Sequence, residues 1–195
     1  MNISTLKGQL LTVMFLLLCG ISAHAEDVVT ITLEKAGTLP EQIDDSKKYT
    51  ITSLKVIGDI NGTDLGLIRD MAGCDADSYI TYGKLADLDL SDAKIVSGGD
   101  YYYDDWGTEY TTSNDVLGDF AFYMCSSLTS VKLPSGLTSI GKYAFGDCSS
   151  LASINLPSSL TSIGKYAFGD CSSLTSINLP FGLTSIGVYA FMGCI

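Results

Sequence analysis

The chain has 195 residues, and its 22 acidic against 11 basic side chains give a formal net charge of −11, which disfavours nucleic acid and anionic membranes as partners. Its one histidine, His24, lies before a predicted cleavage site, so the exported chain would lack every nucleophilic or metal site that needs an imidazole. The remaining route to catalysis, a cleft with two placed carboxylates, has no sign in the sequence, and we therefore expect no enzyme, no cofactor and no metal site.

Residues 1–25 have the composition of a signal peptide. Lys7 gives a positive start, an apolar run follows, and Ala-His-Ala is a small-x-small cleavage site. The apolar run is too short and too early to cross a membrane, and no later segment is long enough. A lipid anchor would need a small residue before Cys19, where leucine stands. We therefore expect an exported chain that starts at Glu26, has no lipid anchor, and is secreted, periplasmic or at the cell surface.

Residues 26–116 are predicted to form a capping region of divergent coils. Alternating apolar and polar residues indicate strands over 28–33 and 51–57. A helix is expected over 63–72, with its first threonine as the N-cap. The leucine spacing at 85–90 repeats the L-x-x-L-x-L strand pattern of the later copies. Polar, divergent coils of this kind are what the end of a repeat array requires.

An insertion over 97–114 is rich in glycine, tyrosine and aspartate and is predicted to form a hairpin or loop at the edge of the fold. Its aromatic side chains could bind a partner, by stacking on a glycan or as a protein hot spot, or could fold back over the first clear coil. Its acids lack the spacing of a calcium loop, so no calcium site is expected. The aromatic candidates are Tyr101, Tyr102, Tyr103, Trp106 and Tyr110.

From residue 117 onward the sequence repeats every 23 residues. The unit reads C-S-S-L-x-S-[VI]-x-L-P-x-x-L-T-S-I-G-x-Y-A-F, in three near-identical copies after a degenerate half copy over 117–125. Such a fixed period is the signature of a stacked repeat protein. Each copy carries one equivalent phenylalanine and one equivalent cysteine, which are Phe122, Phe145, Phe168 and Phe191, and Cys125, Cys148, Cys171 and Cys194.

Each copy is predicted to form one coil of a solenoid. The L-x-x-L-x-L pattern marks a strand, which the proline ends because it has no N–H for the ladder. Gly187 and its equivalents are expected to let the chain turn sharply, and Tyr-Ala-Phe to form about one helical turn. One copy cannot enclose its own apolar residues, so the coils must stack with parallel strands. We expect Leu128, Leu151 and Leu174 to form one buried column and the phenylalanines a second.

These residues resemble the BspA-like class of leucine-rich repeats, which occurs in surface proteins of oral and gut bacteria and of some mucosal parasites. The strand, the proline, I-G-x-Y-A-F and the cysteine recur in that order over 117–195, and a looser likeness extends to the region before it. The resemblance implies an α/β repeat fold: a right-handed leucine-rich-repeat solenoid with a parallel β-sheet and short helical turns, preceded by a divergent N-terminal capping region. It also implies a bacterial protein that adheres to host or bacterial surfaces.

The mature chain would keep five cysteines, which could form disulfides in an exported protein. Neighbours in a ladder point the same way, whereas a disulfide or a metal centre needs sulfurs that converge. Buried free thiols that act as small core residues are therefore expected.

The exposed strand face of the coils is small and weakly polar. It is either a weak binding surface that works through many copies or merely a soluble face. Its candidate residues are Thr129, Lys132, Asn155 and Asn178.

The last coil departs from the consensus towards apolar residues. Phe181, Val188 and Met192 stand where the earlier copies have serine, lysine and glycine. A coil without a cap exposes a strand edge and one face of its core. The change could be drift in a truncated relative, or it could serve self-association, most simply a homodimer about a two-fold axis.

Two functions are compatible with these features. The first is a secreted or surface-exposed leucine-rich-repeat protein that mediates adhesion by binding an extracellular protein or glycan. The second is a structural spacer, or a truncated relative of a longer repeat protein, with no ligand of its own. The missing cap and the featureless strand face favour the spacer, and a binding screen against matrix proteins and glycans separates the two.

Overall fold

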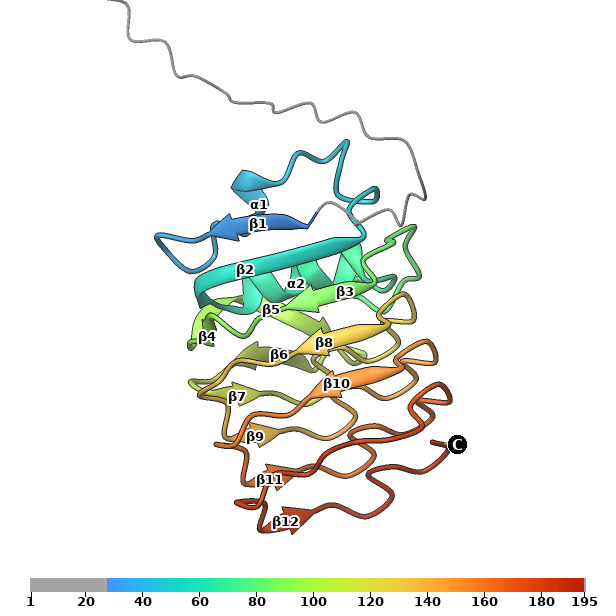
Figure 1. Cartoon of the computed structure of the whole chain (residues 1–195). Coiled ribbons are helices and arrows are strands. Elements are labelled where there is room, and N and C mark those ends of the chain that lie inside the picture. The colour runs from blue at the N-terminus through green and yellow to red at the C-terminus, as the bar shows by residue number, and fades with distance from the viewer. Residues whose placement is uncertain (1–27, 195) are drawn as a thin grey trace, which may run out of the picture.

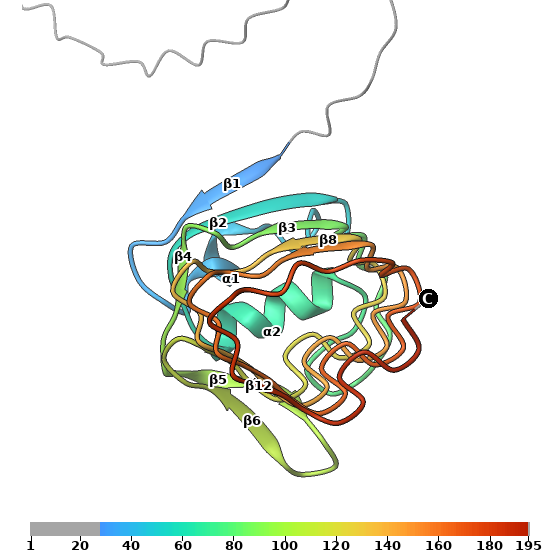
Figure 2. The same ribbon diagram turned by 60° about the horizontal axis from the view of Figure 1, so that its bottom comes forward.

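The coils of the chain stack along one axis, and their strands form two parallel sheets on opposite sides of the stack (Figures 1 and 2). This computed structural model describes residues 28–194. The larger sheet has the strand order β1-β2-β3-β8-β10, and β4 also pairs with β2. Its strands are β1 (Val29–Thr32), β2 (Ser53–Ile60), β3 (Asp87–Asp89), β4 (Ala93–Ile95), β8 (Ser130–Lys132) and β10 (Ser153–Asn155).

The predicted signal peptide and Cys19 lie outside the described residues. Between residues 28 and 194, neither helix combines the length and apolarity needed to cross a bilayer.

A second parallel sheet, absent from the sequence-based prediction, runs through the other apolar set of each coil. It has the order β12-β11-β9-β7, and each strand is only two residues long. In the last coil the L-x-x-L-x-L segment that begins at Leu174 forms no strand, so the larger sheet ends at β10. The strands of the second sheet are β7 (Val116–Leu117), β9 (Ser139–Ile140), β11 (Ser162–Ile163) and β12 (Ser185–Ile186).

The two predicted columns of apolar side chains are confirmed. The equivalent leucines of the three clear copies are at most 3% exposed. The phenylalanine rings stack one on the next, with centroids 5.3–5.4 Å apart. Phe122, Phe145 and Phe168 are fully buried, and Phe191 is half-buried. Stacking therefore encloses a core that no single coil could enclose.

The Tyr-Ala-Phe segments form turns, and the predicted helical turn is wrong. Tyr143 and Asp147 have positive φ angles of 52° and 58°, which no right-handed helix allows. In the first two clear copies, the backbone N–H groups of the tyrosine and the phenylalanine bond to the next coil and not within a helical turn. The N–H of Phe145 donates to the carbonyl of Ala167 in the next coil at 2.7 Å, and Phe122 and Phe168 bond in the same way. These segments therefore join neighbouring coils.

The consensus glycine of each coil serves close packing, and the predicted role in a sharp turn is wrong. Gly187 does not have a left-handed φ. A Cβ atom on Gly187 would lie 2.4 Å from the backbone nitrogen of Lys165 in the coil before, and one on Gly164 would lie 2.5 Å from the backbone of Gly141. Glycine is therefore required because adjacent backbones touch at this point.

Helix α2 (Gly62–Met71) lies inside the outline of the coils, where it fills the core beneath β2 (Figure 2). Its N-cap is Asn61, two residues before the predicted N-cap Thr63, since the side chain of Asn61 accepts from the N–H of Thr63. Asp64 completes a capping box and also accepts from the N–H groups of Gly37 and Leu39, at 2.6 and 2.9 Å. The buried carboxylate thus ties short helix α1 (Leu39–Gln42) to α2.

The insertion forms an antiparallel hairpin of β5 (Gly98–Asp104) and β6 (Glu109–Thr112), which leaves the outline of the coils in Figure 2. Strand β5 packs so closely on α2 that a Cβ atom on Gly62 would clash with the carbonyl of Asp100. The hydroxyl of Thr63 also bonds the Asp100 carboxylate at 3.0 Å. The base of the hairpin is therefore fixed to the core.

Candidate functional site

A buried arginine, which has no carboxylate partner among residues 28–194, holds the hairpin against two other segments. Arg69 of α2 is 0% exposed, and its guanidinium lies over the ring of Tyr103 at 4.8 Å. It donates to the carbonyls of Phe120 and Ala121 at 2.8 and 3.0 Å, and to that of Asp75 at 3.1 Å. Backbone carbonyls accept from both terminal nitrogens of the guanidinium, whereas its Nε has no hydrogen-bond partner among residues 28–194. The hairpin, the 74–83 loop and the first repeat turn therefore share one anchor.

Two of the predicted binding residues are part of the core. Tyr102 and Tyr103 are 1% and 4% exposed. The hydroxyl of Tyr102 donates to the carbonyl of Asp119 at 2.9 Å, and Tyr103 stacks on Phe120 at 5.1 Å. Burial raises the pKa of both phenols. Partner binding is therefore wrong for these two residues, and the alternative, that the rings fold back over the first coil, describes them correctly.

Adjacent residues on a strand normally point to opposite faces, so the burial of two neighbouring tyrosines needs a cause. The register of β5 shifts between Gly98 and Tyr103, which marks a bulge that re-aims the side chains. Tyr110 on β6 packs edge-on against Phe120 at 5.2 Å and is partly buried. Tyr101 lies at the surface, where its hydroxyl donates to Asp77.

Trp106 stands at the tip of the hairpin and is 100% exposed. The turn is closed by bonds between the backbones of Asp105 and Thr108, and Trp106 and Gly107 have φ angles of 51° and 93°. Positive φ at both central positions is the type I′ turn, which favours asparagine, aspartate or glycine. A tryptophan there has a strained backbone and no core contact, so its side chain contributes nothing evident to folding.

A groove of about 400 Å³ lies beside this tip, and we call it the hairpin groove. The end of β5 forms one wall and the 74–83 loop forms the other. The N–H of Asp104 donates to the carbonyl of Ala76 at 2.8 Å, which joins the two walls. The lining residues are Asp77, Ser78, Tyr79, Asp104 and Trp106.

The loop wall of the groove is held by one aspartate. The carboxylate of Asp75 accepts from the N–H groups of Asp77 and Tyr79 at 3.0 and 2.8 Å, and the backbone of Asp75 bonds back to Tyr79. Ser78 is forced to a φ of 67°. Tyr79 is 70% exposed. This wall could not be predicted from the sequence, because the loop has no repeat and no recognised motif.

The groove carries two carboxylates with unused acceptor capacity. Asp77 accepts from the hydroxyl of Tyr101 at 3.1 Å, and Asp104 accepts from the N–H of Gly107 at 2.7 Å, in each case through Oδ1. Among residues 28–194, Oδ2 of either acid has no hydrogen-bond partner. Within the same part of the chain, no three acidic, cysteine or histidine side chains gather as a metal site.

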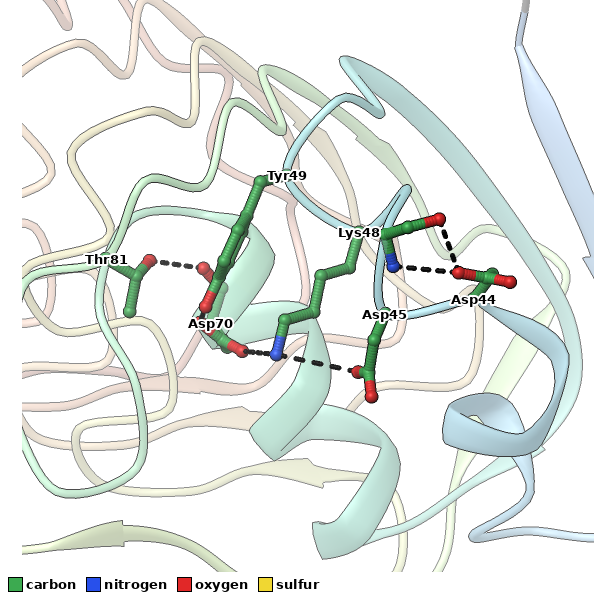
Figure 3. Close-up of polar contacts among 7 residues, drawn as sticks. Asp44, Asp45, Lys48, Tyr49, Asp70 and Thr81 are labelled. Atoms are coloured by element: carbon green, nitrogen blue, oxygen red, sulfur yellow. Dashed lines mark hydrogen bonds and ion pairs between the residues drawn. The ribbon is translucent and has the colours of Figure 1, made fainter.

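A second polar cluster lies at the C-terminal end of α2 (Figure 3). The carboxylate of Asp70 accepts from Lys48 Nζ at 2.9 Å and from the Tyr49 hydroxyl at 2.8 Å, while Thr81 donates to the Asp70 carbonyl. The hydrogen bond from Lys48 to Asp70 raises the pKa of Lys48. Burial, and then the separate hydrogen bond from Tyr49 to Asp70, raise the pKa of Tyr49. These groups are paired with one another and line no cavity, so the cluster is a structural tie between two loops and the helix.

A hollow of about 500 Å³ lies between β1 and the 42–52 loop. Its lining combines aliphatic with polar and charged residues, which are Val29, Ile31, Gln42, Ile43, Asp44, Lys47, Thr50, Ile51 and Thr52. It has no aromatic ring and no pair of acids. The hairpin groove is the better candidate because it combines both.

The five cysteines of the described chain are free thiols, as predicted. Each later thiol donates to a carbonyl of the coil before it: Cys148 to Phe122 at 3.0 Å, and Cys171 to Phe145 at 3.1 Å. Burial raises the pKa of Cys125 and Cys171 to about 12 and that of the other three above the ordinary value. The ladder is therefore a set of core contacts, and none of these thiols is activated.

Two of the four candidate residues on the strand face already make hydrogen bonds within the chain. Lys132 pairs with Asp89 at 2.9 Å, and the Thr129 hydroxyl bonds a neighbouring carbonyl. Burial would raise the pKa of Asp89, but hydrogen bonds from a nearby serine and from Lys132 outweigh it and lower the pKa to about 2. Asn155 and Asn178 are exposed. Their binding role stays a prediction.

The three residues predicted for self-association all lie at the surface. Phe181 is 111% exposed, and Val188 and Met192 are 65% and 43% exposed. Their exposure agrees with a contact surface, and self-association stays a prediction.

Comparisons with known proteins identify the type of repeat. Residues 107–195 match the family model of the BspA type leucine rich repeat region. Similar structures include a leucine-rich repeat protein from Bacteroides ovatus, with 30% identity and a TM-score of 0.47 over 87% of this chain and 36% of that one. No curated protein matches the chain.

Two further similar structures are named for the cell surface or as an antigen. A leucine rich cell surface protein from Faecalibacterium prausnitzii has 24% identity and a TM-score of 0.41, over 86% of this chain and 41% of that one. The pneumococcal vaccine antigen PcpA has 17% identity and a TM-score of 0.36, over 71% of this chain and 37% of that one. The chain thus spans well under half the length of each of these three proteins.

Proposed function

We propose that the chain is an exported recognition module of the BspA-type leucine-rich-repeat kind, which binds a surface partner through the hairpin groove, without catalysis. Residues 107–195 match the model of that repeat family. The repeats supply a rigid support, and the capping region carries the binding site. The proposal places function outside the repeated strand face, whose side chains are small or already paired.

Trp106 is the observation that carries this proposal. A large apolar side chain in full solvent, on a left-handed backbone, is unfavourable on both counts. Aromatic side chains of this kind are enriched at the centres of binding interfaces, because they offer a large contact area at low cost in side-chain entropy. The base of the hairpin is fixed to α2, so the tip is presented in a defined position.

The test is a binding screen of the purified chain against immobilised extracellular matrix proteins and glycans. Trp106→Ala should reduce binding to any partner found by at least about tenfold, the loss expected for one interface hot spot. Tyr82→Ala is the matched control, since it removes another largely exposed ring from the 74–83 loop that does not line the groove. Equal binding by the wild type and Trp106→Ala would overturn the proposal.

The competing function is a spacer without a ligand. It predicts that no immobilised protein or glycan retains the chain and that Trp106→Ala is silent in cells. Export is part of our proposal and has its own test. The protein recovered from surface-shaved or extracellular fractions should begin at Glu26, and an intact N-terminus in a cytoplasmic fraction would contradict it.

A further inference from the structure

We propose that the hairpin groove accepts the cationic side chain of a lysine- or arginine-rich protein segment. This inference rests on the proposed function, because it names the chemistry of the partner at the same groove. It is argued from the charge, the aromatic walls and the rigidity of the site.

Both charged side chains that line the groove are acidic. Segment 74–83 contains two acids and segment 97–114 contains four, and neither segment has a lysine or an arginine. Asp77 and Asp104 stand on opposite walls, and each keeps one carboxylate oxygen without a partner among residues 28–194. A cation placed between the walls can therefore bond to both carboxylates, whereas a sulfated or sialylated glycan would be repelled.

The aromatic walls favour the same sign of charge. The face of an indole or phenol ring is negative, so it attracts an ammonium or guanidinium group. Trp106 is the best such ring by residue type and is fully exposed, and Tyr79 on the other wall is largely exposed. An uncharged sugar could stack on these rings but would gain nothing from the surrounding acids. A cationic side chain uses both features.

The walls are held before any partner arrives. The backbone bond from Asp104 to Ala76 joins them, and the Tyr101 hydroxyl fixes one oxygen of Asp77. A preformed site loses little conformational entropy on binding. The groove, at about 400 Å³, has the size of a small-ligand site and can take a long side chain with part of its backbone.

Trp106 is the only tryptophan of the sequence, so its fluorescence reports directly on the groove. The purified chain is titrated with hexa-arginine, and with a Gly-Ser peptide, hexaglutamate and a neutral oligosaccharide as comparisons. Hexa-arginine should change the emission in a saturable way that about 0.5 M salt abolishes, because exposed charges are screened at that ionic strength. The three comparison ligands should leave the emission unchanged.

Two variants test the carboxylates without disturbing the fold. Asp77→Asn and Asp104→Asn each keep the oxygen that accepts the existing hydrogen bond. Each should weaken hexa-arginine binding about tenfold. Asp45→Asn is the control, since it removes the same charge from an aspartate that is 97% exposed and outside the groove. Equal weakening by all three variants would show attraction to overall charge and overturn the inference.

The outcomes also separate this inference from the proposed function. Saturable binding of the neutral oligosaccharide to Trp106, with no response to hexa-arginine, would keep the groove as a binding site and overturn the cationic partner. A partner from the screen that binds Trp106→Ala as tightly as the wild type would overturn both.

Discussion

Removing one ring from the phenylalanine ladder should destabilise the fold most where the ring has a neighbour on each side. Phe145 is fully buried between Phe122 and Phe168, with ring centroids 5.4 and 5.3 Å away. Phe191 has one such neighbour and is half-buried. Truncating a fully buried phenylalanine to alanine lowers the free energy of unfolding by about 3–5 kcal/mol, and each stacked pair adds about 0.5–1.5 kcal/mol beyond area burial. We therefore expect a loss of about 3–5 kcal/mol for Phe145→Ala and about 1–3 kcal/mol for Phe191→Ala.

The assay is urea unfolding followed by circular dichroism, because Trp106 is already exposed in the folded chain and its emission would report little. Phe168→Ala should match Phe145→Ala. In a stacked repeat the end coil can open alone, so the m-value of each variant must be compared with that of the wild type before a two-state fit is used. Equal losses at the three positions, or a loss below about 1 kcal/mol for Phe145→Ala, would refute the reasoning.

Four further predictions concern the anchor, the thiols, the strand face and the last coil. Arg69→Met should lower the free energy of unfolding by about 3–5 kcal/mol, since it leaves buried carbonyls without their donor; a loss below about 1 kcal/mol in urea would contradict the anchor. In the mature chain that starts at Glu26 and so lacks Cys19, a thiol-reactive dye without reductant should label only the partly buried Cys194 when folded and five cysteines after unfolding; a count of one would indicate two disulfides. The pKa of Asp89 is lower in the folded chain, so its contribution of about 1–2 kcal/mol is present above pH 4 and is lost as the pH falls towards 2. Asp89→Asn should remove that part of the acid sensitivity in pH-dependent unfolding. We also propose self-association through the last coil, so that Phe181→Ser combined with Val188→Lys shifts the chain towards monomer in sedimentation velocity; a wild type that is monomeric at high concentration would exclude it.

The repeats could be predicted from the sequence because their side chains recur at a fixed period. The columns of leucine and phenylalanine follow from that period alone, and so does the direction of the cysteines. The role of Gly187 could not be predicted, since a glycine needed for close approach and one needed for a turn look identical in a sequence. The same is true of Tyr143, whose left-handed backbone follows from the hydrogen bonds between coils.

Half of the candidate site could be found from the sequence. Trp106 and Asp104 lie in an insertion whose composition departs from that of its surroundings. Asp77 and Tyr79 lie in a loop without any such signal, and they join the hairpin only through tertiary contacts. Tyr102 and Tyr103 were grouped with Trp106 by composition, although a bulge in β5 buries both rings.

The single stacking axis has a mechanical consequence. The first two clear coils are joined by two short parallel ladders and by stacked phenylalanine and tyrosine rings. One of the ladders and both ring pairs recur 23 residues later in the last coil. Under tension along the axis, coils should peel away one at a time. A released coil of 23 residues extends to about 75–80 Å, whereas it occupied about 5 Å in the stack. A partner held in the hairpin groove would therefore be attached to an extensible tether, which lengthens in equal steps and refolds when the load is removed.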